Sequence, residues 1–533
     1  DNDGLLDNTK PVIKGETYGM YIASGTTKYY DGILKGQTGG YYGTITEIAT
    51  SGNIVNDNEA SYNINYLERQ TDFVINTRTN KNYSDLNIAI NESEGNDILA
   101  LTRNVNIYVA TEVPEGKIIT IDLMGNSINL NNTITNAGIL TLKDSSENKT
   151  IIRATTNKTL IINNGTITIE NINFASNISS SSYILINNKN MNIENNTIIS
   201  EHGYGINSST TDSVLFINNS EINSYYYGIS NKGKLTIENN TNINVDSYAL
   251  YDNGSANKNE IKNSTLDGNI YLSKNTDYEF TECDIMDGTI SISESTILNI
   301  SGGNISSYIS NYGNTTLNGI ILEKETYGTQ TIINNTGTIN IIDSLLHSYV
   351  PTNHSLSIKE ISNSSSGVLN IDNKTQIIVE GTTVYGIYND GSINSYSGTI
   401  NVTSSSTGYG IYANSGAVNI LAGTTNVSAK VAYGVYINSG EVTLGEAEDP
   451  SGSNYGKETA NVSKINPLIS AIGTTSGYGI KNIQGRLNYF DGKIIGSTSA
   501  KPEIATNVEY LYEAISLVDS ETGHEYCVLE WMR

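Results

Sequence analysis

The chain of 533 residues is poor in several residue types that mark familiar protein classes. It has only 6 prolines, and its Ile, Val and Leu residues are spread evenly, which excludes a disordered, low-complexity chain. Charged residues make up 16%, below the usual quarter, and Asn, Ser and Thr supply the polarity instead. No apolar run approaches the length of a membrane-spanning helix, so no membrane insertion is expected.

Positive charge is also scarce. The 30 Lys and Arg residues face 55 Asp and Glu residues, a net charge of −25. This balance opposes binding to phosphate groups, so no nucleic-acid partner is expected. An acidic surface keeps a secreted protein soluble and can collect Ca²⁺ loosely. Apart from such loosely bound Ca²⁺, no cofactor and no metal site are predicted.

What the sequence does contain is repetition on two scales. Tyr-Gly-Ile-Tyr at Tyr385 returns at Tyr409 and, as Tyr-Gly-Val-Tyr, at Tyr433, at intervals of 24 residues. A longer block, with Tyr-Gly at 18–19 and Tyr-Tyr-Asp-Gly at 29–32, returns 460 residues later. The short period predicts a solenoid, and the long one indicates one link of a tandem array.

The short segments between repeats favour strands. They alternate apolar and polar residues and are separated by Asn-Gly, Asn-Asn or Ser-Gly, as sheet faces on a narrow core require. An antiparallel sandwich also has short strands, but a strand that recurs every 24 residues places equivalent residues one above another. Asn389, Asn414 and Asn438 recur at the following turn, where stacked Asn side chains can form a ladder and tolerate a left-handed backbone. We therefore predict an all-β chain with a parallel β-helix over residues 84–498.

Both ends of such a helix need covers, because they would expose unpaired strand edges. Residues 84–94 predict a short capping helix, with Ser84 as its N-cap and Leu86 and Ile90 on its apolar side. Residues 499–533 are expected to form a small β module at the other end.

Residues 1–83 are interpreted as an end module, the tail of a preceding link. Besides the block at an offset of 460, Glu47–Thr50 matches the segment 503–506, and Tyr66-Leu67 matches the pair at 510–511. The polar start, Asp1-Asn2-Asp3-Gly4, shows no secretion signal, so the chain is expected to be a mature or excised segment.

Three features carry a family resemblance: the opening block (Leu99 to Val105, then Pro114-Glu115-Gly116-Lys117 and 121–125), the Tyr-Gly-Ile-Tyr-Asn coils, and the Tyr-x-Asp-Gly-x-x-x-Gly-x-Thr close. With these the chain resembles extracellular right-handed parallel β-helix proteins of low-GC Gram-positive bacteria, whose fold is similar to that of pectate lyases. The resemblance covers most of the chain. It implies a right-handed β-helix in an exported, surface-associated adhesin, stalk or matrix protein, located outside the cell or on the bacterial surface.

The two cysteines, Cys283 and Cys527, are expected to lie about ten coils apart, or roughly 50 Å at about 4.8 Å per coil. A disulfide needs Cα atoms within about 7 Å, so no bond within the chain is predicted. Buried thiols are the favoured interpretation, and a bond between units through Cys527 stays open.

Catalytic motifs of polysaccharide-active enzymes are incomplete. Asn275-Thr276-Asp277 and His202-Gly203 match two fragments of a polygalacturonase-like site, but in the wrong order and about three coils apart. Arginine, a candidate lyase base, is absent between Arg153 and Arg486. Lysines such as Lys262 and Lys274 lie in that stretch, but not beside an Asp cluster. We therefore predict no catalytic residues and no enzymatic activity.

Two further groups of residues, one acidic and one of histidines, are not predicted to form a site. The densest acidic stretch, Asp246, Asp252, Glu260 and Asp267, could supply a carboxylate pair for glycoside hydrolysis, but a solvated acidic face is favoured. The four histidines show no zinc spacing and are expected at the surface; they are His202, His347, His354 and His524.

The tyrosine column at Tyr385, Tyr409 and Tyr433 has two interpretations. The rings should lie one above another, about 4.8 Å apart. A stacked ladder that stabilises the sheet is favoured, and an exposed strip that holds sugar rings is the alternative.

Three functions follow from these observations. The favoured one is a non-enzymatic extracellular structural or adhesive protein, one link of a tandem β-helix array that forms a stalk, filament or matrix. Its partners would be other copies, neighbouring links, and host or cell-wall glycans. The alternatives are a polysaccharide-binding or polysaccharide-degrading β-helix protein, either a lyase or hydrolase, and a trimeric phage-type spike.

Overall fold

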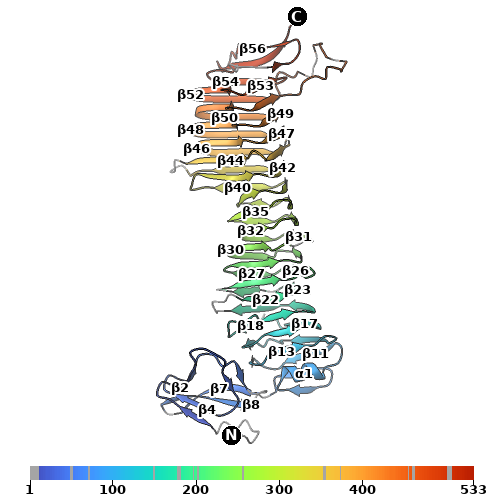
Figure 1. Cartoon of the computed structure of the whole chain (residues 1–533), viewed down its shortest axis with the longest axis vertical. Coiled ribbons are helices and arrows are strands. Elements are labelled where there is room, and N and C mark those ends of the chain that lie inside the picture. The colour runs from blue at the N-terminus through green and yellow to red at the C-terminus, as the bar shows by residue number, and fades with distance from the viewer. Residues whose placement is uncertain are drawn as a thin grey trace. The chain divides into compact units, whose positions relative to one another are not determined.

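The computed structural model describes residues 11–48, 52–59, 61–69, 72–147, 150–176, 182–195, 197–200, 203–254, 257–351, 356–372, 374–453, 455–458, 462–500 and 507–532. It confirms a right-handed parallel β-solenoid, with about 19 turns. The chain divides into two compact units, residues 1–251 and 252–533. In both units the strands are stacked as successive coils (Figure 1).

Each coil contributes strands that stack in parallel on those of its neighbours. In the first unit, β14 (Ile118–Asp122) pairs with β17 (Ile139–Lys143), and β17 pairs with β20 (Thr166–Glu170). In the second unit, β43 (Leu345–Tyr349) and β44 (Ser357–Asn363) both pair with a single long strand, β46 (Gln376–Asn389). From β46 onward, one strand takes the place of two shorter ones.

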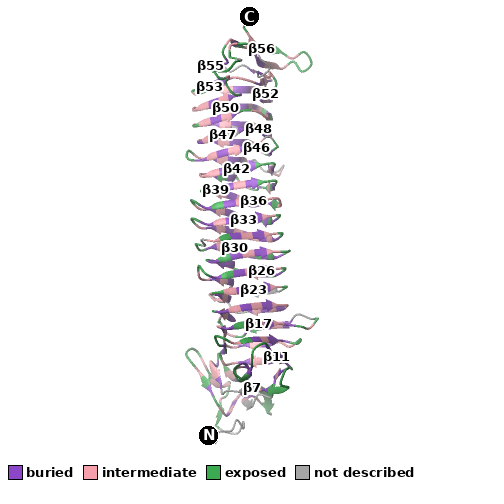
Figure 2. Ribbon diagram, turned by 90° about the vertical axis from the view of Figure 1, so that its right-hand side faces the viewer, coloured by how far each residue is buried: buried purple, intermediate pink, exposed green. Residues whose placement is uncertain are grey.

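The core is a set of apolar columns inside the coils. Leu140, Ile167, Met191, Leu215 and Leu235 occupy successive register positions in the first unit and are all buried. Burying one such side chain stabilises a fold by about 1.5–3 kcal/mol. Burial alternates along the short strands, as the sequence pattern predicts (Figure 2).

In the long strands, glycine occupies one interior column. These strands are β46 (Gln376–Asn389), β48 (Thr399–Ala413), β50 (Thr424–Ile437) and β52 (Leu468–Asn482). A Cβ atom on Gly410 would collide with the Thr425 side chain and with the carbonyl oxygen of Gly434. The glycine of each Tyr-Gly-x-Tyr repeat is therefore a packing requirement.

We expect Gly410→Ala to lower the free energy of unfolding by about 2 kcal/mol, because overpacking a dense interior typically costs this much. The midpoint of unfolding in guanidinium chloride measures the effect. Gly95→Ala is the matched control, since a Cβ there meets open space. Equal stability of the two variants would contradict the packing argument.

The predicted capping helix exists as α1 (Leu86–Glu92), one turn shorter than the predicted range. Its N-cap is Asp85 rather than Ser84: the Asp85 carboxylate accepts hydrogen bonds from the backbone amides of Asn87 and Ile88. An ionised carboxylate is the better acceptor near the positive end of a helix. Leu86 and Ile90 are buried, as predicted.

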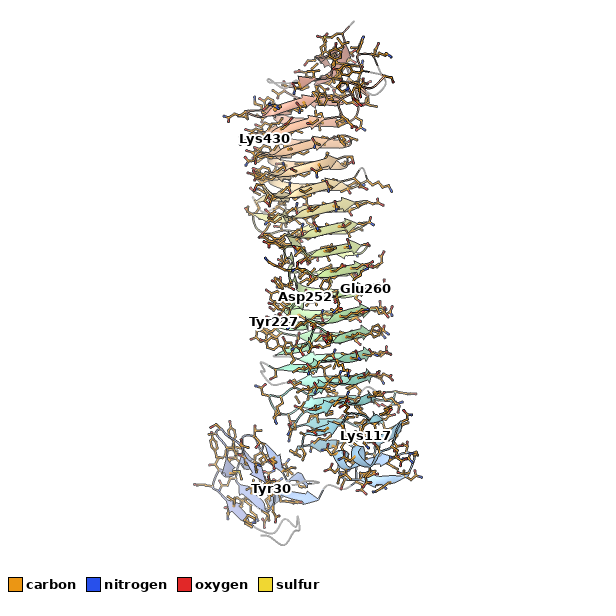
Figure 3. All side chains as sticks on the ribbon, turned by 45° about the vertical axis from the view of Figure 1, so that its right-hand side comes forward. Tyr30, Lys117, Tyr227, Asp252, Glu260 and Lys430 are labelled. Carbon is orange, nitrogen blue, oxygen red and sulfur yellow. The ribbon has the colours of Figure 1, made fainter. Side chains whose placement is uncertain are left out.

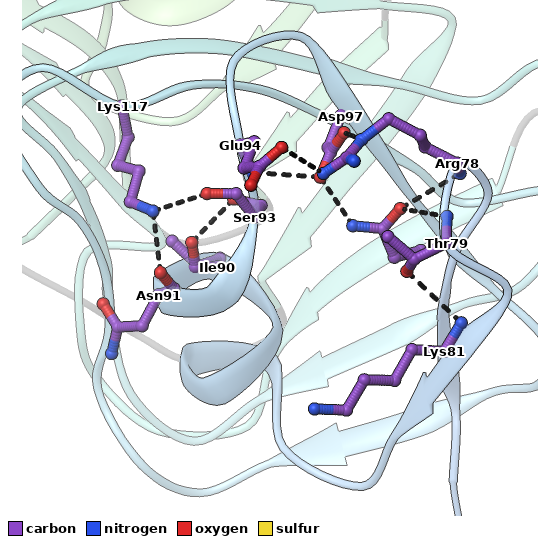
Figure 4. Close-up of polar contacts among 10 residues, drawn as sticks. Arg78, Thr79, Lys81, Ile90, Asn91, Ser93, Glu94, Asp97 and Lys117 are labelled. Atoms are coloured by element: carbon purple, nitrogen blue, oxygen red, sulfur yellow. Dashed lines mark hydrogen bonds and ion pairs between the residues drawn. The ribbon is translucent and has the colours of Figure 1, made fainter.

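The chain before α1 closes the sheet of the first coils. β9 (Val74–Asn76) pairs antiparallel with both β10 (Lys81–Tyr83) and β11 (Asp97–Leu101). Asp97 fixes this corner: it accepts hydrogen bonds from Asn76 at 2.7 Å and from Arg78 Nε at 2.5 Å (Figure 4). These contacts hold the pKa of Asp97 well below its usual range, with Arg78 as the main cause.

The described strands between residues 11 and 69 form three small sheets, the largest with four strands. β1 (Val12–Lys14) pairs in parallel with β4 (Ile33–Gly36). β4 in turn pairs antiparallel with β8 (Tyr62–Arg69), which forms a hairpin with β7 (Gly52–Glu59). The segment also contains a fourth Tyr-Gly-x-Tyr sequence, at 18–21.

The C-terminal end of the chain has the same arrangement. The start of β52 pairs in parallel with β54 (Lys493–Gly496), and β54 pairs antiparallel with β57 (Glu525–Trp531). β57 forms a hairpin with β56 (Tyr512–Val518), so the expected β module at this end is present.

The turns of the two copies also agree. The Tyr29 hydroxyl donates to the Gly32 carbonyl at 2.6 Å, as the Tyr489 hydroxyl donates to the Gly492 carbonyl at 2.8 Å. The same hydroxyls reach the neighbouring hairpin strand, at Asn65 and Cys527.

Two predicted matches between the copies are wrong in register. Tyr66 lies in β8, whose counterpart is β57, whereas Tyr510-Leu511 is a turn before β56. Glu47-Ile48 pairs with Lys28-Tyr29. In the C-terminal copy, residues 507–508 pair with residues 488–489 in the same way. The counterpart of Glu47-Ile48 is therefore 507–508 rather than 503–504. Residues 49–50 and 501–506 lie outside the described residues. The pairing of this strand follows the offset of 460 residues, although more residue types are identical at the other offset.

The structure contains asparagine ladders, but the predicted ladder combined residues that belong to two different ones. Asn389 ends an interior ladder, in which the amide of Asn311 donates to Asn335, Asn335 to Asn363, and Asn363 to Asn389, at 2.7–2.8 Å. All four side chains are fully buried. In the next coil the register partner of Asn389 is Ala413.

Asn414 and Asn438 belong to a second ladder on the outside of the coils. Asn438 donates to Asn414 at 3.0 Å, and Asn414 donates to Asp390 at 2.6 Å. None of the predicted asparagines has a left-handed backbone. Asn171, Asn195, Asn219 and Asn263 do have one, and they stand at another corner of the coils.

Candidate functional site

Two columns of tyrosine rings run along the outer face of the long strands. The first column stacks Tyr385 on Tyr409 at 4.7 Å between ring centroids, Tyr409 on Tyr433 at 5.0 Å, and Tyr433 on Tyr478 at 5.6 Å. The interplanar angles are 5–11°. The predicted column, with rings one above another, is confirmed.

The second column was missed, although its residues close the same repeat. Tyr388 stacks on Tyr412 at 5.1 Å, and Tyr412 stacks on Tyr436 at 5.0 Å. Rings of the two columns meet edge to face, for example Tyr409 and Tyr412 at 5.2 Å. Each interior ring therefore has both stacked and edge contacts, the two favourable geometries for aromatic pairs.

Lysines cover one end of both columns and the other end of the first column. The Lys359 ammonium lies 3.7 Å from the centroid of Tyr388 and 5.8 Å from that of Tyr385. At the other end, the Lys481 ammonium lies 5.2 Å from the centroid of Tyr478. Burial lowers the pKa of Lys359, and the nearby charge of Asp390 opposes this. A cation over a ring face is attracted by the electron-rich face.

This geometry favours the stabilising ladder over a sugar-binding strip. A sugar ring stacks on an aromatic face, but the faces of Tyr409 and Tyr412 are covered by the rings above and below. What the half-buried columns offer to a partner is ring edges and hydroxyl groups. Burial raises the pKa of Tyr409, which keeps its hydroxyl neutral and able to donate.

We expect Tyr409→Leu to lower the free energy of unfolding by about 2 kcal/mol, because two stacked pairs and two edge contacts are lost. Guanidinium chloride unfolding measures the change. Tyr312→Leu, at a tyrosine that is 49% exposed, is the control and should change stability by less than about 0.5 kcal/mol. A folded Tyr409 variant that loses glycan binding alone would favour the strip instead.

A different tyrosine cluster lies in the first unit. Tyr204 stacks on Tyr226 at 5.1 Å, and Tyr227 stacks on Tyr251 at 5.0 Å. Tyr225 and Tyr226 are 45% and 43% exposed and meet edge to face. These two rings are much more open to a ligand than those of the regular columns.

The sequence analysis also missed Glu360, an interior carboxyl. Its side chain is completely buried in β44, at the position that Gly386 occupies in the next coil. Within the described part of the chain neither carboxyl oxygen forms a hydrogen bond. Burial raises its pKa to about 8. Glu360 is therefore neutral at pH 7.

The acidic stretch does not assemble into a carboxylate pair within the second unit. Asp252 is completely buried and accepts a hydrogen bond from the Ser273 hydroxyl at 3.0 Å, whereas Glu260 lies at the surface and pairs with Lys262 at 2.6 Å (Figure 3). Asp267 lies on β32 (Thr265–Leu272), in a different sheet from Glu260. Its pKa is raised by burial and by the charge of Asp287. Asp246 is an exposed residue of the first unit.

The remaining basic candidates make ordinary surface contacts. Lys274 pairs with Glu294 at 2.6 Å. His347 is half-buried, with its Nδ1 atom 3.8 Å from a Glu323 carboxylate oxygen, and His524 lies beside the C-terminal hairpin. His202 and His354 are outside the described residues.

Both cysteines are buried thiols rather than disulfides, as favoured. Burial raises the pKa of Cys283 to about 11, so the unreactive thiol form predominates at neutral pH.

Over the described residues, no three His, Cys, Asp or Glu side chains gather in a group that could hold a metal ion. Within the same ranges, no helix is long and apolar enough to cross a membrane.

Comparison of the chain with protein-family models, with curated proteins and with solved structures found no match.

Proposed function

We propose that the chain is one link of a non-enzymatic, extracellular structural and adhesive protein, built from tandem β-helix links on a bacterial cell surface. The observation that supports this most is the duplicated end structure: residues 11–69 and 468–531 share strand pairings and the Tyr-x-Asp-Gly turn. In this arrangement, the segment that closes one solenoid is followed by the segment that opens the next, as expected at a junction between two links. Neighbouring links and surface glycans are then its partners.

The sequence resemblance adds a more specific proposal. It assigns the chain to the right-handed β-helix surface proteins of low-GC Gram-positive bacteria, with a pectate-lyase-like fold. Because one fold hosts many functions, this assignment concerns architecture and location rather than chemistry.

Electron microscopy of the full-length gene product tests the array. We expect rods or filaments whose repeat corresponds to one link. Compact, isolated particles would contradict the proposal, and a trimer by mass measurement would favour the spike instead.

Polysaccharide binding is the second candidate, and the exposed pair Tyr225 and Tyr226 favours it. Incubation with a glycan panel tests it. Binding that a Tyr225→Ser/Tyr226→Ser variant loses, without a change in stability, would place the site in the first unit. Release of oligosaccharides would overturn the non-enzymatic assignment.

A further inference from the structure

Residues 11–69 form an incomplete coil with three open strand edges. β1 pairs only with β4, β2 (Tyr18–Tyr21) only with β5 (Gly39–Tyr42), and β3 (Lys28–Tyr29) only with β6 (Glu47–Ile48), among the strands that the structure describes. Within the described part of the chain, the opposite edges of β1, β2 and β3 thus carry backbone groups without a strand partner. Open edges of this kind are templates for another strand.

In the C-terminal copy, the same edges are covered by the preceding coil. β52 corresponds to β1 and β2, and it pairs along its length with β50. β53 (Arg486–Tyr489) corresponds to β3, and it pairs with β51 (Glu441–Leu444). In that copy, a single coil, residues 424–444, therefore supplies the strand partners for all three edges.

Side-chain burial shows what the first copy lacks. Ile13 is 43% exposed, whereas its counterpart Ile469 is 1% exposed beneath Thr425 of β50. Tyr478 stacks on Tyr433, but its counterpart Tyr18 has no earlier ring among the described residues to stack on. Tyr21 is 65% exposed, although it stands where the second tyrosine column would continue.

We propose that the edges of β1, β2 and β3 accept the last coil of another link of the same kind. That coil is equivalent to residues 424–444, with a Tyr-Gly-x-Tyr strand that pairs with β1 and β2. Its two tyrosines stack on Tyr18 and Tyr21, and its following strand pairs with β3. The inference rests on the proposed tandem array and names the surface through which one link joins the next.

The C-terminal end of a separate copy does not suit this surface. There β57 pairs antiparallel with β54 and closes the stack. The acceptor therefore needs a link whose last coil is not yet closed by its own hairpin, which is the situation in a continuous polypeptide.

A graft tests the proposal. Residues 467–533 are replaced by a second copy of residues 11–69, so that the graft follows residue 466 directly. Hydrogen exchange with mass spectrometry then follows two peptides, one covering β1 and β2 and one covering β50. The β1–β2 peptide now occurs twice, once in its original place and once on the coil of residues 424–444.

We expect this peptide to split into two equal populations, one exchanging as in the parent chain and one about 100-fold slower. β50 should keep its parental protection, whereas a chain truncated after residue 466 should lose it. Ile13→Asp in the grafted copy alone should abolish the slow population. Two fast populations, or an unprotected β50, would overturn the proposal.

The parent chain gives an independent check. If it were a dimer whose β1–β2 peptide loses protection on dilution, the edges would pair with each other, and the proposal would be overturned. The two proposals can fail separately. Compact particles in the electron microscope, together with a successful graft, would reject the tandem array but support the acceptor edges of β1, β2 and β3.

Discussion

Replacing Glu360 with glutamine is expected to remove a strong pH dependence from the stability of the chain. The carboxyl is completely buried, and its pKa is raised to about 8 from an ordinary value of 4.5. Between these values the unfolded chain releases the proton while the folded chain keeps it. Each pH unit across that window therefore lowers the free energy of unfolding by about 1.4 kcal/mol.

The sign of the effect sets the design of the measurement. Below about pH 4.5 Glu360 is protonated in both states, and the parent and Glu360→Gln should be similarly stable. Above about pH 8 it is ionised in both, and the parent should be less stable than the variant by about 5 kcal/mol. Unfolding in guanidinium chloride from pH 4 to pH 9 measures the difference between the two proteins.

Glu294→Gln serves as the matched control, because that carboxylate lies at the surface beside Lys274. Because both proteins retain Glu360, the parent should not lose stability relative to Glu294→Gln as the pH rises. A constant difference between parent and Glu360→Gln across the whole range would mean that Glu360 is not buried as described.

Asn335→Leu is expected to lower the free energy of unfolding by about 4 kcal/mol. Asn335 accepts from Asn311 at 2.8 Å and donates to Asn363 at 2.8 Å and to the Val368 carbonyl at 3.1 Å. Leucine has a similar volume, so the loss of stability does not come from a cavity. It comes from the buried polar groups that lose Asn335 as their hydrogen-bond partner. Each such group costs about 1–3 kcal/mol.

The outer ladder supplies the control. Asn438 also donates to an asparagine one coil away, at 3.0 Å, but it is half-buried and water can replace the bond. Asn438→Leu should cost less than about 1 kcal/mol. Similar losses in the two variants would show that position inside or outside the coil does not decide the effect.

The stacking of coils was predictable because the Tyr-Gly repeat fixes the register at 24 residues. Residue-level placement was harder, since a shift of one residue moves a side chain from the inside of a strand to the outside. Asn389 and Asn414 are 25 residues apart, one more than the tyrosine interval, and they fall on opposite sides. This mismatch was visible in the sequence.

Glu360 was out of reach for a related reason. Its inward position becomes apparent only when Lys359 is aligned with Tyr385, across a coil of 26 residues without a Tyr-Gly signal. The contacts of the acidic residues were equally hidden, because coil lengths vary through that stretch. Asp252 is buried and contacts Ser273, whereas Glu260 lies at the surface and contacts Lys262.

The parallel pairing of successive coils also has a mechanical consequence. Hydrogen bonds between coils point along the stacking direction, so a pull in that direction loads the bonds of one coil at a time. Each coil of 24 residues that peels away would release about 80 Å of extended chain. Optical tweezers should therefore record a series of steps whose sizes follow the lengths of the individual coils, so that the solenoid yields gradually rather than all at once.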